Sequence, residues 1–76
     1  MIKLSKTEAF KYWKNDCVVI IRSEGFEDLP VIMQDGYLCR YDDTIEREPI
    51  NELLKENDEF YYDENLDEEY YQMKIA

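Results

Sequence analysis

The chain contains no histidine, and it has only two glycines, two prolines and two cysteines among its 76 residues. Without histidine it lacks the most common general base of enzymes and the most common metal ligand. Cys17 and Cys39 are too few and too far apart for a closed zinc site, and Ser5 and Ser23 have no histidine to activate them. We therefore expect no enzyme activity, no catalytic residues, no metal and no cofactor.

Long apolar runs are also missing. The longest extends from Cys17 to Ile21, which is far too short to span a membrane, and no basic leader with an apolar stretch or C-x-x-C motif is present. We expect a cytoplasmic protein with reduced thiols, in which both cysteines act as small hydrophobic residues within strands.

Basic residues are scarce and unevenly placed. The chain has 9 basic and 19 acidic side chains, for a formal net charge of -10. Residues 1–40 contain six of each and are neutral, whereas residues 41–76 contain three basic and thirteen acidic side chains and carry the whole net charge. Such a surface repels nucleic acids and anionic membranes, so any electrostatic partner is expected to be basic.

What remains is enough for one small folded domain over residues 1–76, because 45% of the residues are hydrophobic and 14% are aromatic. Ser5 and Glu8 have the spacing of a capping box and predict a helix that ends near Asn15–Asp16. Trp13 shares its inward face with Ala9 and Phe10 and is expected to be the largest piece of the core.

The middle of the chain predicts a three-stranded antiparallel sheet. The strands are expected at 17–22, 31–34 and 37–41, and Asp35-Gly36 favours a type I′ hairpin turn between the last two. The predicted fold class is therefore α+β, with an N-terminal helix, this sheet, and one or two short acidic helices.

The C-terminal third contains patterns that favour helices and one pattern that also fits strands. Pro49 suits the first turn of a helix that buries Ile50, Leu53 and Leu54 and stops near Asn57. A last helix is expected from about Leu66, with Asn65 as its cap. The repeated acid-and-tyrosine pattern of 58–62 and 67–71 also allows an acidic β-hairpin here.

Seven tyrosines are present, and four of them adjoin the densest acids. Phe60, Tyr62 and Tyr70 suit the core, whereas Tyr61 and Tyr71 are the better candidates for an exposed contact surface. Asp63, Asn65 and Asp67 fit the first positions of a calcium loop, but the glycine and the final glutamate of that motif are missing. We therefore do not assign a calcium site.

The order of elements resembles a known group of proteins. A lysine-containing helix, the strand CVVIIRS, a hairpin at Asp35-Gly36, a segment INELLKE and the terminus DENLDEEYYQMKI follow one another. This arrangement is similar to the small acidic anti-CRISPR proteins of Gram-positive phages that inhibit type II RNA-guided nucleases. In that family, acids mask the pocket in which arginines read the guanines of the PAM. A phage-encoded protein of this kind would act in the cytoplasm of the host cell.

The resemblance implies that the acids from Asp58 to Glu69, together with Asp42 and Asp43, contact the partner. With the two tyrosines the predicted partner-binding residues are Asp42, Asp43, Asp58, Glu59, Tyr61, Asp63, Glu64, Asp67, Glu68, Glu69 and Tyr71.

Carboxylates three or four residues apart on a helix stand about 5–6 Å apart, a spacing that resembles the anionic array of a nucleic-acid backbone. The leading hypothesis is therefore a non-catalytic inhibitor that mimics nucleic acid and blocks the cationic site of a host nucleic-acid enzyme, with a CRISPR nuclease as the first candidate. The alternative is a protein-interaction or homodimeric assembly module without mimicry. Monomer and homodimer both remain open.

Overall fold

The computed structural model describes residues 1–41, 43–49 and 54–75 of the chain. Within these residues two helices and six strands are present, in the order β1 (Ile2–Leu4), α1 (Lys6–Lys14), β2 (Val19–Arg22), β3 (Leu29–Gln34), β4 (Tyr37–Arg40), β5 (Asp43–Pro49), β6 (Glu59–Tyr62) and α3 (Glu64–Ile75). The α+β class and the helix near each terminus are confirmed.

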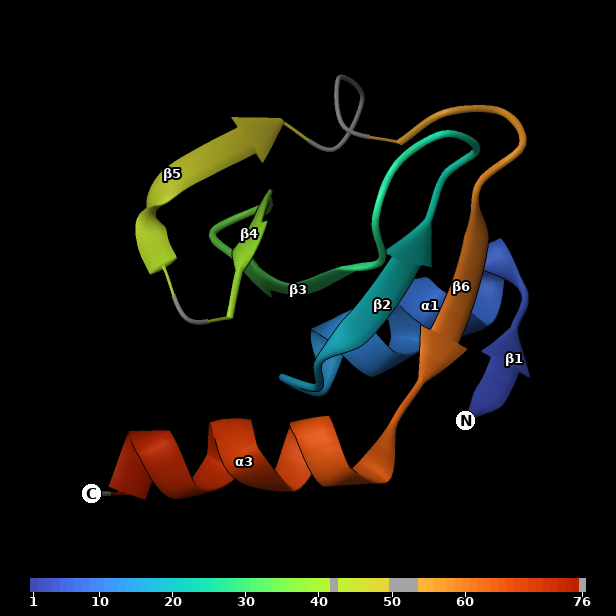
Figure 1. Ribbon diagram of the computed structural model, residues 1–76. Helices are drawn as coiled ribbons and strands as arrows, with labels where there is room; N and C mark the ends of the chain where they lie inside the picture. Colours follow the sequence, from blue (N-terminus) through green and yellow to red (C-terminus); the bar gives the residue numbers. More distant parts are fainter. Residues whose placement is uncertain (42, 50–53, 76) are drawn as a thin grey trace.

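The sheet is larger than the three strands predicted from the sequence. The strand order is β1-β6-β2-β3-β4-β5, and every pair of adjacent strands is antiparallel. Strands β2 to β5 form a meander, whereas β6 inserts between β1 and β2, with Tyr61 opposite both Lys3 and Ile20. This long-range pairing brings the acidic C-terminal part of the chain back beside the N-terminus (Figure 1).

Local sequence signals explain the elements around the sheet. Helix α1 begins with the predicted capping box, because the Glu8 backbone N–H donates to Ser5 Oγ and the Ser5 backbone N–H donates to Glu8 Oε1 at 2.9 Å. The Asp35-Gly36 turn has positive φ values of 54° and 82°, as a type I′ hairpin requires. Both predictions are confirmed.

The segment after β4 differs from the prediction. Pro49 is the last residue of strand β5. Of the helix predicted to follow it, residues 50–53 lie outside the described part of the chain, and residues 54–58 are not helical. A proline is tolerated at such a place because β5 is the last strand of the sheet and its outer side needs no N–H donor.

The final segment is a helix, so the alternative of an acidic hairpin is wrong. Residues 59–62 do form a strand, but its partners are β1 and β2 and not residues 67–71. The helix starts at Glu64, two residues earlier than expected. Asp63 caps it in place of Asn65, because Asp63 Oδ1 accepts from the Asn65 backbone N–H at 2.9 Å.

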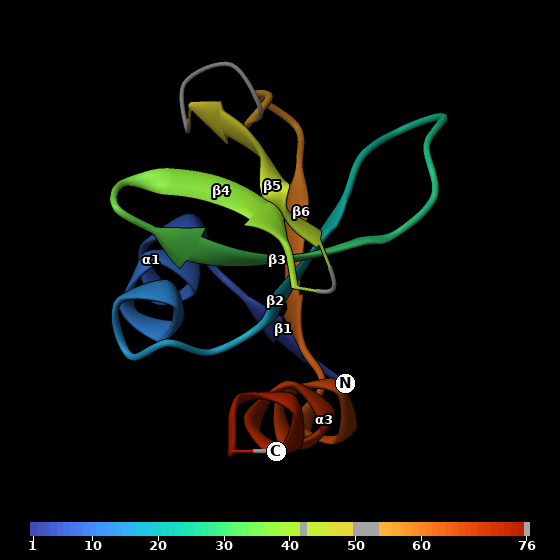
Figure 2. The same cartoon turned by 90° about the vertical axis from the view of Figure 1, so that its left-hand side faces the viewer.

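The two faces of the sheet carry unequal cores. One face packs on α1 and contains Trp13, which is 2% exposed and whose indole N–H donates to the Val31 carbonyl. On the other face, Ile32 of β3, Cys39 of β4 and Val18, which precedes β2, form a smaller cluster with Tyr70 of α3. Figure 2 shows α1 against the sheet and α3 running along one end of the molecule.

In the described residues neither helix is long and apolar enough to cross a membrane. Cys39 is buried and Cys17 is half-buried, and the two cysteines are not joined by a disulfide bond. The interpretation as small hydrophobic residues is confirmed for Cys39.

Candidate functional site

The predicted partner-binding residues do not form one continuous surface. Asp58 and Glu59 lie where β6 begins, beside the loop that joins β2 to β3, whereas residues 63–71 belong to the opposite end, at α3 (Figure 1). Asp43 begins β5 opposite Arg40, and Asp42 lies outside the described residues.

The acids at the start of β6 are engaged in local structure. Asp58 accepts from the Ser23 hydroxyl at 2.7 Å and from the Lys55 backbone N–H at 2.8 Å, so it joins two loops. Glu59 accepts from the Tyr61 hydroxyl and lies 3.8 Å from Lys3 Nζ. The hydrogen bond from Tyr61, helped by the charge of Lys3, lowers the pKa of Glu59. Both carboxylates already have partners within the chain.

Tyr61 is less available than predicted. It is half-buried, and the Arg22 guanidinium lies over its ring at 4.5 Å from the centroid. The hydrogen bond to Glu59, together with burial, raises the pKa of the Tyr61 hydroxyl. Its ring face and its hydroxyl are therefore both occupied within the chain.

Two of the acids near α3 also stabilise the fold. Asp63 caps the helix, and Asp67 faces the sheet, where its two oxygens accept from the Val18 backbone N–H and from the Tyr62 hydroxyl, each at 3.0 Å. Burial and the bond to Asp67 raise the pKa of Tyr62 to about 12. Asp63 and Asp67 were predicted to bind a partner, but their carboxylates bind other groups of the same chain.

Four predicted residues remain exposed on α3, and we call them the acidic face: Glu64, Glu68, Glu69 and Tyr71. Glu64 and Glu68 lie on successive turns, and with Tyr71 they border a shallow, open depression of about 370 Å³ whose floor includes Tyr62 and Asp67. Tyr71 is 56% exposed, which confirms its predicted exposure.

Little positive charge competes for this face. The one lysine of α3, Lys74, forms an ion pair with Asp16 and lies over the Tyr70 ring. Glu64 and Glu68 form no ion pair with any described residue, and Glu69 accepts a long hydrogen bond of 3.4 Å from Tyr41. Glu64 also suits the first turn of a helix for structural reasons, because an anion there is favoured by the helix dipole.

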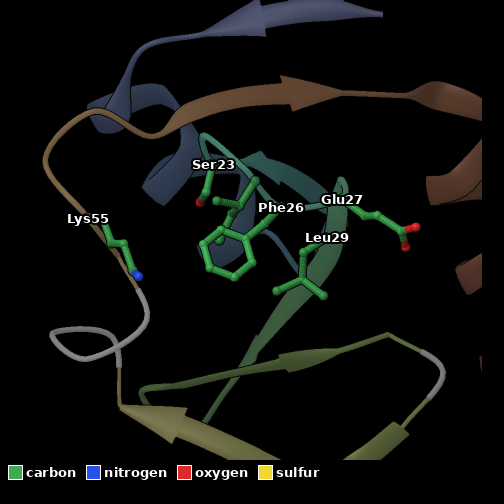
Figure 3. Close-up of a pocket in the computed structure, with 6 residues that line it drawn as sticks. Ser23, Phe26, Glu27, Leu29 and Lys55 are labelled. Atoms are coloured by element: carbon green, nitrogen blue, oxygen red, sulfur yellow. The ribbon is translucent and has the colours of Figure 1, made fainter.

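The sequence interpretation overlooked Phe26. This aromatic residue lies in the loop between β2 and β3 and is 68% exposed. It lines a hollow with Ile21, Ser23, Glu27, Leu29 and Lys55 (Figure 3). The available signal was an aromatic residue that follows Gly25 within an acidic loop.

Chemically, the acidic face can attract and bind cationic groups. No group of three or more histidine, cysteine or acidic side chains in the described part of the chain could hold a metal ion. The molecule thus has the character of a small α+β domain that presents an acid-rich terminal helix. Comparisons of the chain with protein-family models, with curated proteins and with solved structures found no match.

Proposed function

We propose that the chain is a non-catalytic acidic inhibitor that mimics nucleic acid and occupies the cationic DNA-binding site of a host nucleic-acid enzyme. A type II RNA-guided nuclease is the first candidate, which would make the chain an anti-CRISPR protein. The observation that carries the proposal is the acidic face of α3, with Glu64 and Glu68 exposed on successive turns and free of ion pairs to described residues.

The spacing of these charges supports the mimicry. Side chains four residues apart on a helix stand about 5–6 Å apart, and a DNA strand presents a phosphate about every 3.4 Å along its axis. Lysines and arginines arranged for phosphates can therefore meet more than one carboxylate of α3. The excess of 19 acidic over 9 basic side chains would also speed the encounter with a basic partner.

Tyr71 would add an aromatic contact, which a row of phosphates cannot provide. Its ring borders the same depression as Glu64 and Glu68, and an exposed aromatic ring can accept a guanidinium or pack on aliphatic stems. Such a contact would distinguish one basic protein from another.

The test is inhibition of DNA cleavage by a guide-loaded type II nuclease. One variant combines Glu64→Gln, Glu68→Gln and Glu69→Gln. The matched control combines Glu24→Gln, Glu27→Gln and Glu56→Gln, which removes the same number of charges from exposed positions at the other end of the molecule. We expect the first variant to inhibit roughly tenfold less, or not at all, and the control to inhibit like the unmodified chain.

Equal effects of the two variants would show that net charge matters and the acidic face does not. The absence of inhibition by the unmodified chain across type II nucleases would reject the nuclease as target. A retained ability of the first variant to displace DNA from the enzyme would reject the mimicry.

A protein-interaction or homodimeric module is the second candidate. It is favoured by the exposed apolar side chains of the last turns of α3, Tyr71, Met73 and Ile75, each at least half exposed. Apolar association is not screened by salt, whereas mimicry is. Sedimentation at low and high salt would separate the two, because self-association that persists at high salt favours the second candidate.

A further inference from the structure

A second surface lies at the end of the molecule opposite α3. The loop between β2 and β3 and the segment that precedes β6 are held side by side there by the Ser23–Asp58 hydrogen bond (Figure 1). Between them is a hollow of about 290 Å³. Ile21, Leu29 and the Phe26 ring form its apolar lining, and Lys55 approaches from the segment before β6 (Figure 3). We call it the Phe26 hollow.

The loop that carries Phe26 is held in place. Its ends are joined by a bidentate pair, in which the Arg22 guanidinium donates to both oxygens of Asp28 at 2.9 and 2.8 Å. Its tip is a tight turn, closed by the Phe26 backbone N–H on the Ser23 carbonyl, with Gly25 at a φ of 81°. An exposed aromatic on such a loop is ordered before binding, so less entropy is lost when a partner binds.

The rim of the hollow is acidic. Glu24, Glu27 and Glu56 are exposed around it and form no ion pair with a described residue. Two further hollows adjoin it and share Ser23 and Phe26 with it, and Glu24 lines both. An apolar cavity is thus surrounded by places for cationic groups.

A contact within the chain indicates that the Phe26 ring can bind a cation. The Lys55 ammonium lies over the Phe26 ring at 5.2 Å from its centroid. A cation over an exposed aromatic ring is a recurrent recognition contact. The contact shows that this ring face is accessible to an aliphatic side chain that ends in a cation, which is the kind of side chain that a basic partner presents.

We propose that the Phe26 hollow binds an extended segment of a partner protein that presents an apolar side chain next to an arginine or lysine. The apolar side chain fills the hollow, and the neighbouring cation meets Glu24, Glu27 or Glu56. The volume supports a peptide side chain, since it lies at the lower end of the roughly 300–1,000 Å³ typical of small-molecule sites. This proposal does not depend on the acidic face of α3.

The test uses the full chain as bait for a random peptide library displayed on phage. We expect the enriched peptides to share an aliphatic or aromatic residue beside arginine or lysine. A synthetic peptide of the enriched sequence is then titrated into the isotope-labelled chain. Amide signals of residues 21–29 and 54–59 should shift, and those of α3 should not.

Two variants sharpen the test. Phe26→Ala should weaken binding of that peptide roughly tenfold or more, because it removes an exposed anchor without touching the core. Tyr37→Ala, which removes another exposed aromatic in the β3–β4 hairpin, is the control and should leave affinity unchanged. The combination Glu24→Gln, Glu27→Gln and Glu56→Gln should reduce the salt dependence of binding.

Three results would overturn the proposal. The first is a library without a basic-apolar consensus. The second is a peptide that binds the Phe26→Ala variant as tightly as the unmodified chain. The third is self-association that Phe26→Ala abolishes, which would assign the hollow to a second copy of the chain.

Discussion

Helix α1 and helix α3 pack on the same sheet, but different forces hold them. Helix α1 contributes Ala9 and Trp13, both almost fully buried, to the larger apolar cluster. Helix α3 contributes one buried side chain, Tyr70, to the smaller cluster. Apolar burial involves no charge that salt can screen or a proton can neutralise, so we expect α1 to separate from the sheet only in global unfolding.

The weaker apolar contact of α3 is supplemented by hydrogen bonds. Asp67 binds Val18 and Tyr62, and Asp16 accepts from the Tyr70 hydroxyl at 2.9 Å and pairs with Lys74. Acidic side chains therefore attach the helix whose other acidic side chains form the candidate site. The comparison predicts that α3 is the first element to detach when charge or protonation changes.

The largest effect is expected on the α1 side. Trp13→Ala removes the largest buried side chain and the bond from its indole to the Val31 carbonyl, and it should lower the free energy of unfolding by about 3–5 kcal/mol. Urea unfolding followed by circular dichroism measures this loss. A loss below about 1 kcal/mol would contradict the assignment of α1 to the main core.

Asp67→Ala should have the next largest effect. It leaves the Val18 N–H and the Tyr62 hydroxyl without their acceptor, which costs about 1–3 kcal/mol. Hydrogen exchange should accelerate in residues 64–75 before it does in β2 and β3. Glu68→Ala removes the adjacent charge from an exposed position and is the control, with an expected change within about 0.5 kcal/mol.

Alkaline pH should loosen α3 more gradually. Burial and the bond to Asp16 raise the pKa of Tyr70 to about 12, above the value near 10 of an unfolded tyrosine. The folded state therefore holds this proton to higher pH, so the contribution of Tyr70 to stability is constant below about pH 10 and falls as pH rises toward 12. Tyr70→Phe should cost about 0.5–1.5 kcal/mol at neutral pH and flatten this decline. An equally steep decline in the variant would assign it to other groups.

The smallest effect is expected for the exposed ion pair. Lys74→Gln removes the partner of Asp16 at the end of α3, and surface pairs contribute about 0.2–1 kcal/mol. Its effect on the urea midpoint should disappear at high salt. Persistence of the effect at high salt would show that Lys74 acts by packing on the Tyr70 ring.

The features that depend on near neighbours in sequence could be predicted. The Ser5–Glu8 box, the Asp35-Gly36 turn and the burial of Trp13 all follow from residues within one turn or one helix face. The pairing of β1 with β6 could not be predicted, because Leu4 lies opposite Phe60 and no local pattern signals so distant a partner. Pro49 is compatible with both a helix start and an edge strand, and in the structure it is the last residue of strand β5.

The same limit applies to the candidate site. Asp67 and Glu68 are adjacent acids in one run, but Asp67 serves the fold and Glu68 faces outward. The two acids differ because they lie on different sides of α3. Asp67 is three residues from the buried Tyr70 and therefore lies on the same side of the helix. A helix assigned with its phase would have separated the two, whereas the charge pattern alone groups them together.

The position of the single tryptophan determines which part of the unfolding reaction fluorescence can monitor. Trp13 lies on the side of α1 that faces β3, so its fluorescence emission reports on the packing of α1. It should not change when α3 alone separates from the sheet. Far-ultraviolet ellipticity, in contrast, sums both helices. A titration in which ellipticity falls before the emission maximum shifts to the red would reveal a partly undocked species directly, without any label.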